Sequence, residues 1–175
     1  MKEIHMNAPV TDEQYFTYKE TEGGVIVLSC TCGDDIIVLP ETLDGKQVVN
    51  IASGLFTYNA TGAKGIYVAD TIEVIPENAF SNCGDLEVLV LGTGVKVIER
   101  ASIVVNENLR VISVLSDSLE EMGTHVIVGC GALEEVRFNG DCENVGSVIG
   151  GWGDSSPVIY GPADSNIEQY AKEAG

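Results

Sequence analysis

Cysteine and histidine are the residue types in this chain that could supply a nucleophile or a metal ligand. Cys30 and Cys32 form a Cys-x-Cys pair, and the two histidines are His5 and His125. A structural zinc site usually takes four ligands from two such pairs, and the sequence has no second pair. A catalytic cysteine would need His125 beside Cys130 together with a third, orienting group, which is not visible. We therefore predict a protein that is not an enzyme, with no catalytic residue, no metal site and no cofactor.

Glycine clusters and acidic pairs are the other segments that could bind a small ligand. The segments GTG at 92–94, GCG at 129–131 and GGWG at 150–153 lack the spacing of a phosphate-binding loop followed by a helix. The acidic pairs at 34–35 and 134–135 fit no calcium-loop pattern. We interpret the glycines as turns and the acids as solvated surface.

The chain is strongly acidic. Its 27 acidic and 9 basic residues give a formal net charge of −18 over 175 residues. Such a surface repels phosphate backbones and anionic membranes, so we predict no nucleic-acid partner. No run reaches the roughly 18–20 apolar residues of a membrane span, so we predict no membrane insertion. The opening sequence MKEIHMNAPVTDEQYF lacks the apolar core of a signal peptide, which fits either a cytoplasmic protein or a trimmed mature chain.

An internal repeat organises the sequence. Segments that begin at Ile72, Val95 and Leu119 align with starts 23 and 24 residues apart, and six of their seven matched columns are apolar throughout. The columns are Ile72/Val95/Leu119, Ile75/Ile98/Met122, Phe80/Ile103/Ile127, Cys83/Asn106/Cys130, Leu86/Leu109/Leu133, Leu89/Ile112/Val136 and Leu91/Val114/Phe138. The pattern continues with decay at Val48, Ile51, Phe56, Ile66 and Val68 upstream, and at Cys142, Val145, Val158 and Tyr160 downstream.

The triplet Leu86, Leu89 and Leu91 has the L-x-x-L-x-L form of a leucine-rich repeat. One repeat cannot bury its apolar side alone, but stacked repeats form a continuous core. We therefore predict a β-rich, right-handed leucine-rich-repeat solenoid of about five to six coils with repeats of about 23–24 residues. The alternative is a sandwich or barrel, whose strands would recur about every 8–12 residues rather than at this longer period.

These columns resemble the BspA-type leucine-rich repeats of bacteria. The segment IEVIPENAFSNCGDL carries the Ile-Pro, Ala-Phe, Cys and Leu positions of that repeat, and LPETLDGKQV resembles its opening unit. Repeats three and four depart from it, with Ser102-Ile103 and Val126-Ile127 in place of the Ala-Phe pair. The resemblance implies a non-catalytic module that binds another protein, such as a host extracellular protein or a protein of a neighbouring cell. It also implies a role in adhesion at the cell surface or in secreted form.

The two ends of the chain predict caps. The β-prone runs EQYFTYKE and GVIVLSC flank the turn-like TEGG and predict an N-terminal β-hairpin cap within residues 1–35. The solenoid is expected over residues 36–163. Residues 164–175 predict a short capping helix, since Ser165 and Glu168 fit a capping box and Ile167, Tyr170 and Ala171 form an apolar stripe. We expect all three parts to form one structural domain.

The column Cys83/Asn106/Cys130 predicts a stack of buried side chains at a tight turn, with Asn106 bonded to turn backbone. The outward side of the strands is the candidate partner surface, because residues between the core columns alternate to the opposite side. The candidates are Tyr67, Val88, Val90, Val111, Ser113, Glu135 and Arg137. Exposed apolar patches of this kind mark contact sites, although β-propensity, or cover by a cap or a second copy, explains them equally well. Trp152, in the GGWG segment, could plug the last coil or be an exposed anchor for a partner, and we favour the core position.

Two locations follow from these observations. The family resemblance favours a surface or secreted adhesion module. The missing signal peptide and the odd number of five cysteines instead favour a cytoplasmic scaffold or a self-associating structural protein.

Overall fold

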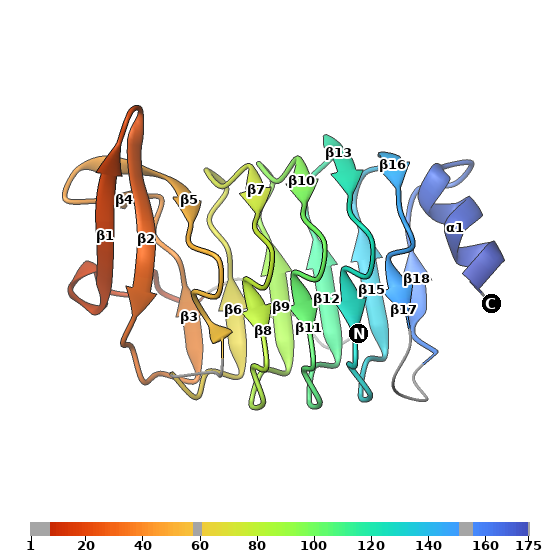
Figure 1. Cartoon of the computed structure of the whole chain (residues 1–175), viewed down its shortest axis with the longest axis horizontal. Coiled ribbons are helices and arrows are strands. Elements are labelled where there is room, and N and C mark those ends of the chain that lie inside the picture. The colour runs from red at the N-terminus through yellow and green to blue at the C-terminus, as the bar shows by residue number, and fades with distance from the viewer. Residues whose placement is uncertain (1–7, 58–60, 151–155, 175) are drawn as a thin grey trace.

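The computed structural model describes residues 8–57, 61–150 and 156–174. Its coils stack side by side along one axis, with a β-hairpin at the N-terminal end and a helix at the C-terminal end (Figure 1). The predicted β-solenoid with two capped ends is therefore confirmed.

Three parallel sheets run along the solenoid and enclose its core (Figure 1). The longest has six strands: β3 (Ile36–Val38), β6 (Gly65–Tyr67), β9 (Val88–Leu91), β12 (Val111–Val114), β15 (Glu135–Phe138) and β18 (Val158–Tyr160). The second contains β7 (Val74–Ile75), β10 (Val97–Ile98), β13 (Leu119–Met122) and β16 (Cys142–Val145). The third contains β8 (Phe80–Ser81), β11 (Ile103–Val104), β14 (Ile127–Val128) and β17 (Ile149–Gly150).

The repeat columns of the sequence are the strand register of the structure. Leu89 pairs with Ile66 on one side and Ile112 on the other, and Ile112 pairs with Val136. These four side chains are at most 1% exposed. Apolar side chains of successive coils thus stack directly on one another, which gives each coil the buried surface that it cannot form alone.

Each middle coil turns through left-handed backbone at two repeat positions. Asn78, Ala101 and His125 occupy the first position, with φ values of 58°, 53° and 55°. Asn82 and Val105 occupy the second, with φ values of 55° and 56°. Asparagine tolerates this region well, whereas a β-branched valine rarely adopts it. Val105 is therefore a strained substitution within the repeat.

The N-terminal cap begins with a 3-10 turn, Glu13–Tyr15, and continues into the predicted hairpin of β1 (Phe16–Thr21) and β2 (Gly24–Cys30). Strand β2 then pairs in parallel with β5 (Lys46–Ile51), which pairs with the short β4 (Thr42–Leu43). The hairpin therefore joins the first coil through a shared sheet.

The C-terminal cap is α1 (Asn166–Ala174). Ser165 caps it as predicted, because its Oγ accepts a hydrogen bond from the Glu168 N–H at 3.0 Å. The Glu168 carboxylate accepts from the Asp164 N–H rather than from that of Ser165. Ile167 is fully buried, and the Tyr170 hydroxyl accepts from the Ile149 N–H at 2.7 Å. The helix is thereby bonded to the last coil.

The last strand corrects one sequence prediction. The sequence predicts Val158 and Tyr160 in the last two columns of the repeat, those of Leu89 and Leu91, but Ile159 pairs with the buried Val136 instead. Val158 and Tyr160 are 54% and 48% exposed. A shift of one residue reverses every side chain of a strand, and the sequence VIGGWGDSSP before β18 lacks the repeat motif that would determine that register.

Candidate functional site

The outward side of the six-stranded sheet is formed by two rows of side chains in register. One row joins Ile36, Gly65, Val88, Val111, Glu135 and Val158, and the other joins Val38, Tyr67, Val90, Ser113, Arg137 and Tyr160. We name these twelve residues the outer strip. All seven sequence candidates lie in it. Five further members were missed, at its two ends: Ile36, Val38 and Gly65, together with Val158 and Tyr160.

The middle of the outer strip is less exposed than the sequence suggested. Val90 and Ser113 are each only 3% exposed, so the expected fully exposed row is wrong at these two positions. Val90 lies between Tyr67 and Ser113 in the ladder, and Ser113 lies between Val90 and Arg137. Adjacent strands are about 4.8 Å apart, so larger neighbours cover a small side chain between them. Tyr67 and Arg137 are therefore the side chains that a partner would meet in the middle of this row.

Tyr67 and Val88 give the first half of the outer strip an apolar surface. Gly65 has no side chain, and a Cβ placed there would lie 3.7 Å from the Tyr67 ring and 3.6 Å from Ile36. The Tyr67 ring and Ile36 thus fill the space that the glycine leaves. Burial raises the pKa of the Tyr67 hydroxyl above its ordinary value. Tyr67 therefore acts here as a neutral, largely apolar side chain.

The second half of the outer strip contains an ion pair. Arg137 donates from Nε to the Glu135 carboxylate at 2.8 Å. The Arg137 guanidinium also lies over the Tyr160 ring, with 5.6 Å from its central carbon to the ring centroid. Such contacts hold the arginine flat against the sheet. The charge of Arg137 is consequently balanced within the surface.

One margin of the outer strip is a ladder of alternating charge. It consists of Asp35, Lys64, Glu87, Arg110 and Glu134, each directly before a strand of the sheet. Lys64 pairs with Asp35 at 3.1 Å and Arg110 with Glu134 at 2.6 Å. Side-chain hydrogen bonds to these two acids raise the pKa of both bases, and Glu87 adds a further favourable charge. We name this set the mixed margin.

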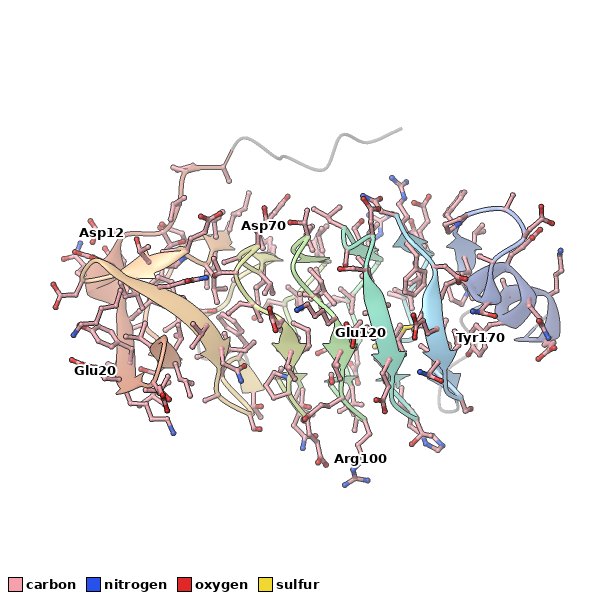
Figure 2. All side chains as sticks on the ribbon, turned by 90° about the horizontal axis from the view of Figure 1, so that it is seen from above. Asp12, Glu20, Asp70, Arg100, Glu120 and Tyr170 are labelled. Atoms are coloured by element: carbon pink, nitrogen blue, oxygen red, sulfur yellow. The ribbon has the colours of Figure 1, made fainter. Side chains whose placement is uncertain are left out.

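The other margin is purely acidic. It consists of Asp70, Asp117 and Asp141, which lie in the turns after β6, β12 and β15 and are all exposed. Figure 2 shows Asp70 on the same long side of the solenoid as Asp12, and Arg100 on the opposite side. The turns after β6, β12 and β15 have no lysine or arginine, and Lys96, which follows the GTG turn after β9, pairs with Glu73. We name this set the acidic margin.

The cysteines are buried in the core, whereas His125 is exposed. All five cysteines are buried thiols. Burial raises the pKa of Cys30, Cys32, Cys130 and Cys142, which disfavours the reactive thiolate. His125 is exposed at a turn while Cys130 is 4% exposed, and Cys130 directs its thiol to the Ile103 carbonyl. Across residues 8–57, 61–150 and 156–174, no three His, Cys, Asp or Glu side chains gather as a metal site.

Asn106 occupies the cysteine column as the sequence predicted. Its Oδ1 accepts from the Cys83 N–H at 2.8 Å, and its Nδ2 donates to the Phe80 carbonyl at 2.9 Å. At the same column of the preceding coil, the Cys83 thiol donates to the Phe56 carbonyl at 3.0 Å. The column therefore holds turn backbone together from coil to coil, and its chemistry is structural.

Surface hollows lie at the N-terminal end of the solenoid. One, of about 540 Å³, is lined by residues 8–12, Tyr15, Asp34, Asp35 and Ile36. Another, of about 520 Å³, lies on the other side of Val10 and Thr11 and reaches Asp70. The first borders the outer strip at Ile36.

No helix among the described residues is long and apolar enough to span a bilayer. The prediction for Trp152 stays untested, because this residue lies outside the described residues.

Comparison with known proteins agrees with the coil geometry. The sequence model of the BspA type leucine rich repeat region matches residues 37–149 in six copies. The crystal structure of a T. pallidum leucine-rich repeat protein superposes with a TM-score of 0.57 at 21% sequence identity. That match covers 95% of this chain and 96% of the other. No curated protein matches the sequence.

Proposed function

The chain belongs to the BspA-type leucine-rich repeat family, and from that premise we propose that it is a non-catalytic protein-binding module whose contact surface is the outer strip. The family and the fold support a repeat module for protein–protein interaction. The observation that carries the proposal is the half-buried apolar face across neighbouring strands, where Val88 and Val111 are in register in one row and Tyr67 lies in the other. Apolar patches that span several elements mark interaction sites on folded proteins.

We further propose that the module serves adhesion, at the cell surface or in secreted form. BspA-type repeats are often found on proteins of the cell surface, and the acidic exterior suits a protein in contact with other macromolecules rather than with lipid. The test is labelling of intact cells that express the protein, with an antibody and mild protease. Labelling and cleavage before lysis support the proposal. Protection until lysis contradicts the surface location.

A cytoplasmic scaffold is the second candidate, favoured by the five buried thiols. Reduced cysteines without disulfides are typical of a reducing compartment. The two candidates share the binding surface and differ in location, so the same labelling experiment separates them. If the protein is protected on intact cells, its partners should be sought by cross-linking inside the cell.

The contact surface has its own test. Lysine substituted for Val111 would place a charge in the centre of the outer strip, whereas lysine for Val97 would place the same charge on β10 in a different sheet. Both valines are half-buried strand residues, so the two variants are matched. We expect partner capture by cross-linking to fall for Val111→Lys and to persist for Val97→Lys. Equal capture by both variants would exclude the outer strip as the contact surface.

A further inference from the structure

From β3 to β15, the outer strip offers a partner side chains but almost no backbone hydrogen bonds. Strands β6, β9, β12 and β15 are paired on both sides. At the β3 edge, the Thr11 N–H donates to the Val38 carbonyl at 3.0 Å, and the Val38 N–H donates to the Thr11 hydroxyl at 3.0 Å. An extended peptide laid on this face would therefore leave its own peptide groups against apolar side chains without partners, which is costly. An α-helix satisfies its peptide groups internally and avoids this cost.

The size of the outer strip also favours a helix over a second globular surface. Six strands in register span about 24 Å at a spacing of about 4.8 Å, and the two rows lie about 7 Å apart. This contact is much smaller than the roughly 800 Å² per partner of a stable interface between two folded proteins. A helix rises 1.5 Å per residue, so about 16 residues would cover the whole length. A second copy of this chain would in addition bring another −18 charge against the first.

The margins determine the charge of the partner. The acidic margin places Asp70, Asp117 and Asp141 along one side of the outer strip, and the base that follows the intervening GTG turn, Lys96, already pairs with Glu73. On the mixed margin, both bases already pair with acids, and Glu87 lies between them with its negative charge in excess. A helix whose apolar stripe rests on the strip would present its flanking positions to these margins. Lysine and arginine are the residues that these positions would favour.

We propose, resting on the protein-binding function above, that the outer strip docks a basic amphipathic α-helix of the partner protein. The apolar stripe of this helix covers Tyr67, Val88 and Val111, and its lysines and arginines flank the stripe and face the acidic margin. The helix axis runs along the solenoid, across the strands. Because the contact is small, the complex is a weak and reversible one.

The test uses three synthetic helical peptides of about 16 residues, a length set by the helical rise, and the full chain. The first peptide has a leucine stripe flanked by lysine and arginine. The second has the same stripe flanked by glutamate, and the third is a scramble of the first without the stripe. We expect fluorescence anisotropy to show binding of the first peptide alone, weakened by added salt because exposed charges are screened.

Matched variants of the protein locate the binding surface. We expect Val111→Lys to weaken binding of the basic peptide at least about tenfold, equal to about 1.4 kcal/mol, and Val97→Lys to leave it unchanged. Asp117→Asn should weaken binding severalfold, whereas Glu121→Gln, an exposed acid on β13 in another sheet, should not. Equal binding of the scrambled or glutamate-flanked peptide overturns the proposal, as does an equal effect of Val111→Lys and Val97→Lys.

The outcomes separate this proposal from the function on which it rests. If Val111→Lys abolishes capture of the natural partner but the basic peptide does not bind, the outer strip is a contact surface and the basic-helix partner is wrong. If neither the natural partner nor the peptide responds to Val111→Lys, both proposals fail.

Discussion

Asn106 provides the sharpest test of how the coils hold together. It is fully buried, and its amide bonds the Cys83 N–H and the Phe80 carbonyl of the preceding coil. Replacement by alanine removes both hydrogen bonds and leaves the two backbone groups in the core. A buried polar group that loses its partner costs about 1–3 kcal/mol, so two such groups predict a loss of about 2–6 kcal/mol. That is a large part of the total stability of an ordinary domain.

Asn106→Cys is the matched control. Cys83 and Cys130 occupy the same column in the neighbouring coils, and the Cys83 thiol donates to the Phe56 carbonyl, the counterpart of the Phe80 carbonyl. A cysteine at position 106 would keep a donor there and fill much of the space. We therefore expect Asn106→Cys to lose clearly less stability than Asn106→Ala, about 1–2 kcal/mol, since one weak hydrogen bond remains in place of two.

Urea unfolding followed by circular dichroism measures both variants. The midpoint concentration of urea should fall far more for Asn106→Ala than for Asn106→Cys. Hydrogen exchange should show the largest loss of protection in the turns of the two coils that Asn106 joins. The reasoning is refuted if Asn106→Ala loses less than about 1 kcal/mol, or if the two variants lose the same amount, because the hydrogen bonds would then contribute little.

Three further predictions concern single sites. Val105→Asn should raise the free energy of unfolding by about 1 kcal/mol, because valine is strained at φ 56°. Asparagine suits this repeat position, since Asn82 already occupies it at φ 55° in the preceding coil. A lower urea midpoint for the variant would contradict this. Burial acts to raise the pKa of Asp141, but hydrogen bonds from backbone N–H groups, including that of Ile167 at the start of α1, outweigh it and lower the pKa. The stability that Asp141 adds is therefore present above its unfolded pKa of about 4 and is lost as pH falls through the lower folded value. Between about pH 5 and pH 2, the Asp141→Asn variant should consequently lose less stability than the parent protein. Parallel profiles of unfolding free energy against pH would contradict this. Thiol titration of the native protein should be slow and should reach five thiols after unfolding, since all five cysteines are buried; rapid reaction in the native state would exclude this packing.

Much of the fold was available from the sequence because a solenoid makes its spatial contacts periodic. Residues one repeat apart become neighbours, so the columns that contain Leu89, Ile112 and Val136 were also the strand pairs. The helix cap was predictable for a local reason, since Ser165 and Glu168 act within one turn. Both signals depend on short or regular distances along the chain.

The candidate surface was only partly predictable. Alternation along each strand placed Val88 and Val111 on the outward side, but exposure depends on the neighbours in adjacent coils. Ser113 is buried because its small side chain lies between the larger side chains of Val90 and Arg137 on the two adjacent strands. The ion pair and the ring contact of Arg137 likewise depend on where its side chain lies on the folded surface.

The sequence by itself determined the repeat, the apolar core and the two caps, because each follows from periodic or local patterns. The tertiary structure alone decided the register of β18, because the sequence before this strand lacks the repeat motif and a single-residue shift exchanges inside for outside. It also decided the joining of the hairpin to β5, which brings together β2 and β5 although β3 and β4 lie between them in the sequence. When two residues do not occupy matching positions of the repeat, packing in three dimensions decides whether they contact each other. No periodic pattern in the sequence then reveals the contact.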